Sequence, residues 1–393
     1  MRAVKLPALP ALHPRLDPRR ARGYRGYRGG RRPVRWFWWL ALGALLLVLA
    51  LLEWNLCRAF PQVSILCRGA AAALSRGLAL VTGLVPFPLS EWLLVGLTAG
   101  WLLWLAVRLC QRRWAVLGRG LCRLACMLCA AVFLFVALYG VHHTAPSLAS
   151  SLGLEVAQYT VEELDRLAAR TVEQVNALAA QAPRDGSGSC AFGSFRELAE
   201  QVSAAYGDLA EKYTVFDRPG AGRVKRSLLG GRAMSWVDLA GYYCPWTAES
   251  VISSDVVQSH IPFNIAHETA HGLGIGPEAE CNFAAWLACK DSGDIRLRYS
   301  AWLCAYVYAN NALYAVDREA SAGHYSALCP QARHDLQVLN DSLKRFEGRV
   351  NDLGSAANDA LIRATGQSDG VRSYGRVVDL MLAYLAYYSA EME

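Results

Sequence analysis

The sequence has few charged residues for its length. Only 19% of its 393 residues are Asp, Glu, Lys or Arg, whereas 54% are hydrophobic. Soluble globular chains carry roughly 25% charged residues and a smaller apolar share. This shortage of charge argues against a wholly soluble protein and predicts that part of the chain lies in a membrane.

Acidic residues are almost absent from the first 35 residues, which hold eleven Lys or Arg and a single acid, Asp17. This tail contributes +10, so with a formal charge of +7 for the whole chain the remainder stands at −3. A tail of Arg, Gly, Tyr and Pro cannot bury a core, which predicts a disordered cytoplasmic segment over residues 1–35. RNA binding by the tail is the alternative, but no nucleic-acid partner is expected for the rest.

Three runs of the sequence are apolar and long enough to cross a bilayer. They lie at about residues 36–52, 89–107 and 124–141. The first run is not a cleaved signal peptide, because Glu53 follows it where a small-residue cleavage site would be needed. The sequence therefore predicts a membrane domain of three transmembrane helices over residues 36–141, with the lipid bilayer as its partner.

Residues 69–89 lie between the first two of these runs and are only moderately apolar. Arg76, Gly83, Pro86 and Pro88 interrupt them. Such breaks favour an interfacial or re-entrant segment, because backbone groups freed from a helix are costly in the hydrocarbon core. A fourth span is the alternative.

Arginine is unequally distributed between the connections that join these runs. Residues 108–123 hold five arginines, whereas the connection between the first and second runs holds three. Positively charged connections stay in the cytoplasm, so the tail and residues 108–123 are expected there. An odd number of spans then places residues 142–393 outside the cytoplasmic (inner) membrane, as an extracytoplasmic domain.

None of the cysteines expected on that side forms a C-x-x-C pair, which argues against a zinc knuckle. Disulfides can form in such a compartment, but their pairing cannot be read from sequence. The cysteines concerned are Cys57, Cys67, Cys190, Cys244, Cys281, Cys289, Cys304 and Cys329.

Residues 142–393 are expected to form a mainly helical domain. Apolar residues recur there at helical spacing, and only residues 249–257, rich in Val and Ile, predict a strand. The predicted fold class is therefore mainly α: three N-terminal transmembrane helices, then a largely helical domain with at most a short strand or small sheet. The helical stretches are residues 152–183, 195–213, 294–316, 334–346 and 371–393.

A His-Glu-Thr-Ala-His segment at residues 267–271 carries the clearest chemical signal. Pro262 near its start and glycines after its end place it on a helix. His267 and His271 are then one turn apart on one face, where both imidazoles can bind a single Zn²⁺. Glu268 lies beside the metal-bound water and is the predicted catalytic base, taking a proton from the attacking water and delivering it to the leaving amine.

A catalytic zinc site needs a third protein ligand and an open position. Three glycines permit a chain reversal after the motif, and Pro277 can begin a second helix. We expect Glu278 to be the third ligand and Asn282, one turn further, to orient His267 or His271. Glu280 is the alternative ligand, and because it points about 200° away from Glu278 both cannot bind the same ion.

The motif alone is moderate evidence, because His-Glu-x-x-His arises by chance in roughly one chain in a hundred of this size. The alternative is a helix with two unrelated histidines. For Glu278 the alternative is a solvated acid in the first turn of a helix, where its negative charge interacts favourably with the helix dipole. The glycine turn and the acid-rich second helix favour a metal site.

The motif and the pattern Glu278-x-x-x-Asn282 together resemble the gluzincin superfamily of zinc peptidases, in which the third ligand begins a Glu-x-x-x-Asp pattern. Asn replaces Asp here, and the gap before Glu278 is shorter. The chain also resembles a bacterial family of uncharacterised membrane proteins with three N-terminal spans and a zincin-like domain, over about residues 36–390. The resemblance rests on Gly241–Trp246, Pro262–Gly274, Glu278–Phe283 and Ser373–Val378.

That resemblance implies that Tyr242, Tyr243, Tyr374 and Arg376 line the cleft, with one of them donating a hydrogen bond to an oxyanion. The alternative is that the tyrosines are core residues. Together these observations predict a membrane-anchored zinc metallopeptidase that acts on a peptide or an envelope protein. The alternatives are a non-catalytic envelope scaffold with a structural metal, closed by a fourth ligand, and a zinc amidase acting on peptidoglycan peptides.

Overall fold

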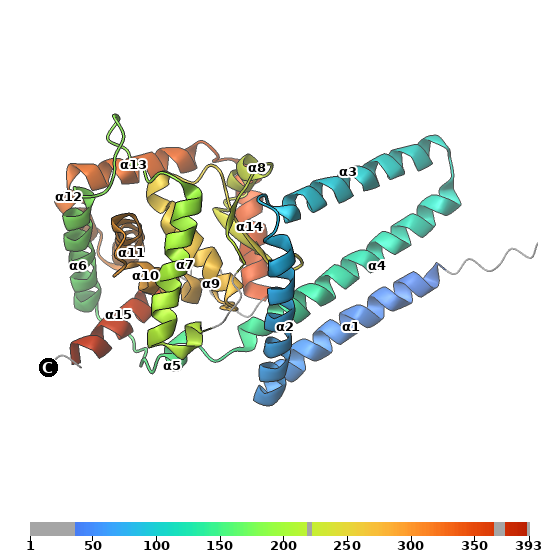
Figure 1. Ribbon diagram of the computed structural model, residues 1–393, viewed down its shortest axis with the longest axis horizontal. Coiled ribbons are helices and arrows are strands. Elements are labelled where there is room, and N and C mark those ends of the chain that lie inside the picture. The colour runs from blue at the N-terminus through green and yellow to red at the C-terminus, as the bar shows by residue number, and fades with distance from the viewer. Residues whose placement is uncertain (1–35, 218–221, 365–373, 391–393) are drawn as a thin grey trace, which may run out of the picture.

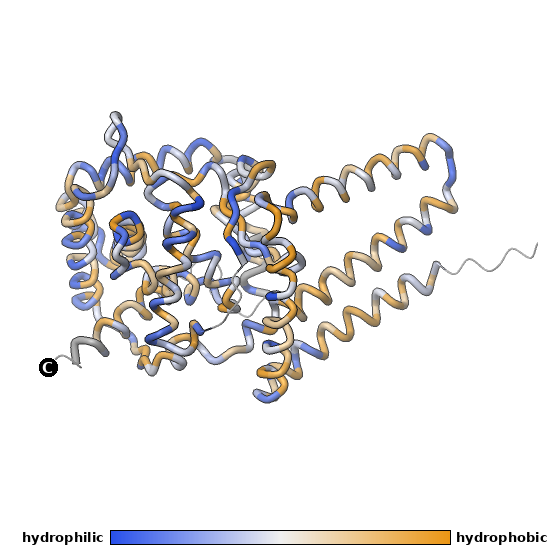
Figure 2. The backbone as a smooth tube through the Cα atoms, in the orientation of Figure 1, coloured by the Kyte–Doolittle hydropathy of each residue, from blue (hydrophilic) through white to orange (hydrophobic). Residues whose placement is uncertain are grey.

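The computed structural model describes residues 36–217, 222–364 and 374–390. The predicted basic tail, residues 1–35, lies outside them. Four long apolar helices come first: α1 Phe37–Ala59, α2 Pro61–Thr82, α3 Leu89–Cys110 and α4 Trp114–Leu138. Each is long and apolar enough to cross a membrane. Figure 2 shows the hydrophobic colour along most of α1, α3 and α4.

The second of these helices differs from the others in direction. In Figure 1, α1, α3 and α4 extend lengthwise away from the rest of the molecule, whereas α2 runs steeply across their inner ends. The sequence predicted an interfacial or re-entrant segment interrupted within residues 69–89, whereas the structure has a continuous helix there as far as Thr82. The interrupting Gly83, Pro86 and Pro88 follow its end and do not break it.

The remaining chain forms the predicted helical domain. Its helices are α5 Leu148–Ser151, α6 Val161–Ala179, α7 Phe195–Lys212, α8 Gly231–Trp236, α9 Ile261–Gly272, α10 Glu278–Cys289, α11 Ile295–Val316, α12 Arg318–Ala327, α13 Pro330–Lys344, α14 Arg349–Ala364 and α15 Tyr374–Ala390. The predicted fold class is confirmed. The helix expected over residues 152–183 is shorter because α6 begins at a capping box formed by Thr160 and Glu163.

The core of this domain surrounds α11, which packs against α6, α9, α10 and α15. Its fully buried side chains include Tyr299 and Leu303, which contribute to the same cluster as Phe283 and Trp286 on α10. Burial of such large side chains supplies most of the free energy that holds helices together. The core thereby fixes α9 and α10 relative to each other.

A small sheet lies beside α9. Its strands are β1 Lys225–Arg226, β2 Gly241–Cys244 and β3 Glu249–Ile252, in the order β1-β3-β2. The central β3 pairs in parallel with β1 and antiparallel with β2, and every residue of β3 is buried. The sequence predicted a strand only at β3. Strand β2 lies at the edge of the sheet, so one side of its backbone pairs with no other strand in the described part of the chain.

The sheet is attached directly to the turn between α2 and α3. The side chains of Lys225 and Glu249 form a buried ion pair that also bonds to the backbone of this turn. Glu91, in the first turn of α3, accepts hydrogen bonds from the backbone amides of residues 228–230. The membrane helices and the helical domain are therefore joined by buried polar contacts and not only by the chain.

None of the twelve cysteines, all of which lie in the described part of the chain, is in a disulfide.

Candidate metal centre

Helix α9 carries His267, Glu268 and His271. Its first turn contains Pro262, whose missing N–H costs no helical hydrogen bond at that position. The two histidines are one turn apart, and their ring centroids are separated by 4.8 Å. The Ser250 hydroxyl on β3 donates to the carbonyl of Glu268 at 2.8 Å, which ties α9 to the sheet.

Glu278 reaches the two histidines from the start of α10. The chain reverses after α9 through Gly274, whose φ of +82° is a conformation that side-chain-bearing residues rarely adopt. Glu278 then places Oε2 3.2 Å from Nε2 of His267 and Oε1 3.4 Å from Nε2 of His271. The donor atoms of all three residues lie within 4.8 Å of one another, so the group could hold a metal ion.

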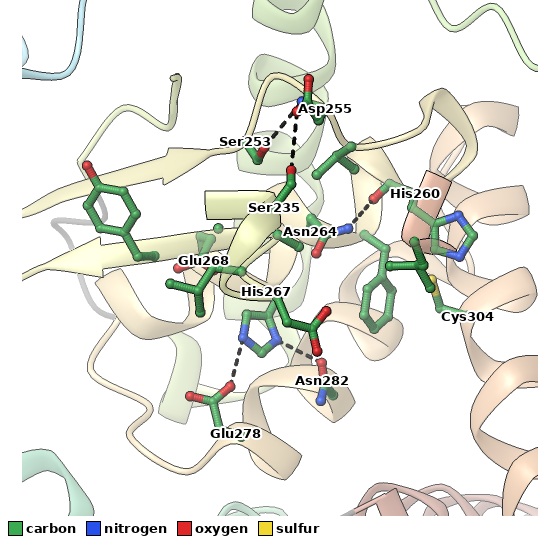
Figure 3. Close-up of a pocket in the computed structure, with 18 of the residues that line it drawn as sticks. Ser235, Ser253, Asp255, His260, Asn264, His267, Glu268, Glu278, Asn282 and Cys304 are labelled. Carbon is green, nitrogen blue, oxygen red and sulfur yellow. Dashed lines mark hydrogen bonds and ion pairs between the residues drawn. The ribbon is translucent and has the colours of Figure 1, made fainter. Parts of the chain in front are cut away.

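The second ring nitrogen of each histidine is engaged elsewhere. Nδ1 of His267 lies 2.8 Å from Oδ1 of Asn282, on the side of the ring opposite Glu278 (Figure 3). Nδ1 of His271 lies 3.1 Å from the carbonyl of Ile275 and 2.9 Å from the hydroxyl of Tyr139. Such bonds fix the ring orientation of metal-binding histidines. The His₂Glu set, with both Nε2 atoms facing the same point, fits a Zn²⁺ ion.

The carboxylate of Glu268 is buried beside this group. Its Oε2 has no hydrogen-bond partner among the described residues. Burial raises the pKa of Glu268 to about 8, with the negative charge of Glu278 adding to the shift and His267 opposing it. Gly241 packs closely against this carboxylate. A Cβ at position 241 would lie 2.6 Å from Oε1 of Glu268. Only glycine allows β2 to pass so near the carboxylate.

Charge pairing shifts the pKa values of Glu278 and His271 in opposite directions. Burial alone would raise the pKa of Glu278, but the two histidines hold it well below its usual value. Burial alone would lower the pKa of His271, and the charge and hydrogen bond of Glu278 outweigh it and raise that pKa. The lowered pKa of Glu278 favours the ionised carboxylate, which is the form that binds a metal ion, whereas the raised pKa of His271 means that this ring releases a proton when an ion binds.

The group opens into a cavity of about 710 Å³. Its walls come from the end of α4, from β2 and the loop before it, from α9, and from α13 and the residues after it. Figure 3 shows His267, Glu268 and Glu278 at one side, with Asn264 and His260 further along. The candidate metal group and the carboxylate of Glu268 therefore line the same cavity.

The structure brings some of the predicted residues to this site and places others elsewhere. Tyr242 and Tyr243 line the cavity from β2. Glu280 is not in the metal group; it lines a separate small pocket, where burial raises its pKa to about 7 against the opposing charge of Arg376. Arg376 is exposed and is not among the residues lining the cavity. The side chain of Tyr374 lies outside the described structure.

Sequence reasoning missed several residues at the site. Tyr139 and His143 line the cavity from the end of α4, where the chain was divided into two domains at residues 141 and 142. A Tyr-Gly-Val-His-His sequence at residues 139–143, across the end of the apolar run, was the available signal. His260 is buried and also lines the cavity.

A comparison with family models gives one match. The model described as "Protein of unknown function (DUF3810)" matches residues 68–382. The chain belongs to this family. The match runs from within α2 to within α15 and includes the whole candidate metal centre, and it agrees with the expected resemblance at the level of a family without an assigned function. No curated protein and no solved structure matches the chain.

Proposed function

We propose that the protein is a membrane-anchored zinc-dependent metallopeptidase. The observation that carries the proposal is the convergence of His267, His271 and Glu278 in the cavity that also holds the buried carboxylate of Glu268. A structural zinc site is closed by four protein ligands, whereas this group has three among the described residues and faces an open cavity. The arrangement therefore supports catalysis better than a structural role.

A zinc ion in this group would polarise the peptide carbonyl and make water a stronger acid. Glu268 accepts the proton of the attacking water and passes it to the leaving amine. Burial holds the pKa of Glu268 at about 8, and a cation bound by the three ligands would lower it toward the ionised form that a general base needs. Asn282 holds the ring of His267 in place, and the free edge of β2 can pair with an extended peptide backbone.

The proposed location is the outer side of the cytoplasmic membrane, with the N-terminus and the α3–α4 connection in the cytoplasm. In Figure 1 the start of α1 and this connection lie at the end of the helices far from the helical domain. Residues 108–123, around the connection, carry five arginines, and positive charge of this kind is retained in the cytoplasm. The substrate would then be a peptide or a protein of the envelope.

The test uses the full chain purified in detergent. We expect one zinc ion per chain and hydrolysis of a mixed peptide pool, and we expect Glu268→Gln to abolish hydrolysis with zinc retained. Protein that holds no zinc would overturn the proposal. Zinc bound without any hydrolysis would instead indicate a scaffold with a structural metal, and hydrolysis confined to peptidoglycan peptides would indicate an amidase.

A further inference from the structure

The candidate metal centre lies at the end of a membrane helix. Tyr139, the residue that ends α4, has its hydroxyl 2.9 Å from Nδ1 of His271. Phe135, one turn earlier in the same apolar helix, lines the cavity together with His267 and Glu278. If α4 crosses the bilayer, the reacting groups lie at the bilayer surface.

The hairpin between β2 and β3 reaches further along α4. Nε1 of Trp246, in this hairpin, donates to the carbonyl of Ala131 at 3.3 Å, and the Trp246 ring packs against Phe135. Ala131 precedes Tyr139 by two helical turns, about 12 Å along the axis. Trp246 is 45% exposed, and exposed tryptophans of membrane proteins gather at the bilayer interface. The sheet is therefore held against the membrane surface and does not stand away from it.

The space beside α4 leads to the edge strand. Helices α3 and α4 meet at the Cys110–Trp114 connection and separate toward the helical domain (Figure 1). No residue in the most apolar window of α3 is buried by the protein. At the inner end of α3, the Ser90 hydroxyl lies 3.1 Å from that of Tyr242, which places β2 over this side of the membrane helices. A chain leaving the bilayer here meets β2 first and then the metal group.

The charge of the cavity selects among membrane ligands. Its described lining holds the acids Asp238, Asp255, Glu268, Glu278 and Glu347, and none of its described lining residues is Lys or Arg. A phospholipid headgroup with a phosphate would find no cationic side chain in this lining, so that only the proposed zinc ion could offset its charge. A neutral or basic polypeptide suits this lining, because its charge is opposite to that of the acids.

We propose that the substrate is the juxtamembrane segment of another membrane protein, cut within a few residues of the bilayer surface. The inference rests on the proposed peptidase function and adds the class of substrate. The transmembrane helix of the substrate lies against the open face of α3, and the segment that follows it pairs with β2 and crosses the metal group. Anchoring both proteins in one bilayer raises the effective concentration of the segment at the site.

The experiment uses the full chain with zinc in lipid vesicles and compares three substrates with one randomised segment of about twelve residues. In the first the segment directly follows a transmembrane helix; in the second a Gly/Ser linker of about 40 residues separates them; in the third the segment is free in solution. We expect the first to be cleaved at least about tenfold faster than either of the others. Glu268→Gln protein corrects for contaminating proteases.

The outcomes separate the two proposals. Equal rates, or faster cleavage of the linker or soluble substrate, overturn the juxtamembrane inference and leave the peptidase intact. No cleavage of any pool by zinc-loaded protein overturns the proposed function and this inference with it.

A second measurement locates the substrate helix. A photoreactive residue replaces Leu94 on α3 in Glu268→Gln protein, and a matched one replaces Leu51, similarly exposed on α1. We expect the membrane-anchored substrate to cross-link to position 94 at least about fivefold more than to position 51. Equal cross-linking at the two positions would contradict docking on α3.

Discussion

Nζ of Lys225 lies 2.6 Å from Oε1 of Glu249, and both side chains are almost completely buried. Lys225 also donates to the carbonyls of Thr82 and Phe87, and Glu249 accepts from the backbone amides of the first two residues of α3. A buried ion pair is tolerated only when its remaining hydrogen-bonding capacity is used, and here the turn between α2 and α3 uses it. The pair therefore joins the sheet next to the metal centre to the membrane helices.

Loss of one partner of this pair should be strongly destabilising. Lys225→Met leaves the carboxylate of Glu249 buried without its cation, and we expect the free energy of unfolding to fall by about 3–5 kcal/mol. Unfolding of the full chain in detergent measures the change. The matched control is Glu200→Gln, which breaks the exposed pair Arg196–Glu200 and should have little effect. Equal effects of the two substitutions would contradict the role of the buried pair.

The two acids at the start of α10 should differ in their effect on zinc. Glu278→Ala removes a member of the metal group, and we expect zinc content to fall from one ion per chain to almost none. Glu280→Ala alters a side chain that faces a different pocket and should leave zinc content unchanged. Metal analysis of the two purified variants measures their zinc content. The reverse result would make Glu280 the ligand.

Glycine at the start of β2 should be required for catalysis but not for zinc binding. In Gly241→Ala, the new Cβ displaces the carboxylate of Glu268, so we expect kcat for peptide hydrolysis to fall by about a hundredfold. Gly207→Ala is the control, because no atom lies within 4 Å of the position where its Cβ would be built, on α7. A Gly241→Ala enzyme with normal kcat would show that Glu268 is not the base.

Acid should destabilise the fold partly through His260. Burial lowers the pKa of His260 to about 4, against the opposing charge of Asp335. Below the unfolded value of 6.5 the unfolded chain binds a proton that the folded chain does not. Stability is therefore lost as pH falls from 6.5 to 4, by about 3 kcal/mol from this group. We expect His260→Gln to remove that part of the pH dependence, measured by unfolding at both pH values. His334→Gln, on an exposed face of α13, should not change it.

Local patterns were sufficient to predict the helix that carries the motif. Pro262 and the glycines after His271 marked its ends, and α9 spans Ile261–Gly272. Spacing of one turn also placed the two histidines on one face. The third ligand was left open because two acids two residues apart differ only in the side of α10 on which they lie. That side depends on how α10 packs in the core around α11, which involves residues far apart in the sequence.

The rest of the site depends on contacts between distant segments. Tyr139 and His271 are 132 residues apart in the chain, and no spacing rule relates them. Gly241 is explained only by the carboxylate that packs against it. Hydropathy likewise identified the apolar runs. Gly83 and Pro86 were read as breaks within residues 69–89, but both lie beyond the end of α2.

The attachment of the sheet to α3 and of the metal centre to α4 affects how the protein can be produced. A soluble fragment beginning after Thr144, where the last candidate membrane span ends, would lack Tyr139 and His143, and with them one wall of the cavity. It would also expose Lys225 and Glu249 to solvent and remove the carboxylate of Glu91 from three backbone amides. Such a fragment would be a poor substitute for the whole chain, and crystallisation or screening should retain the helices in detergent or a lipid disc.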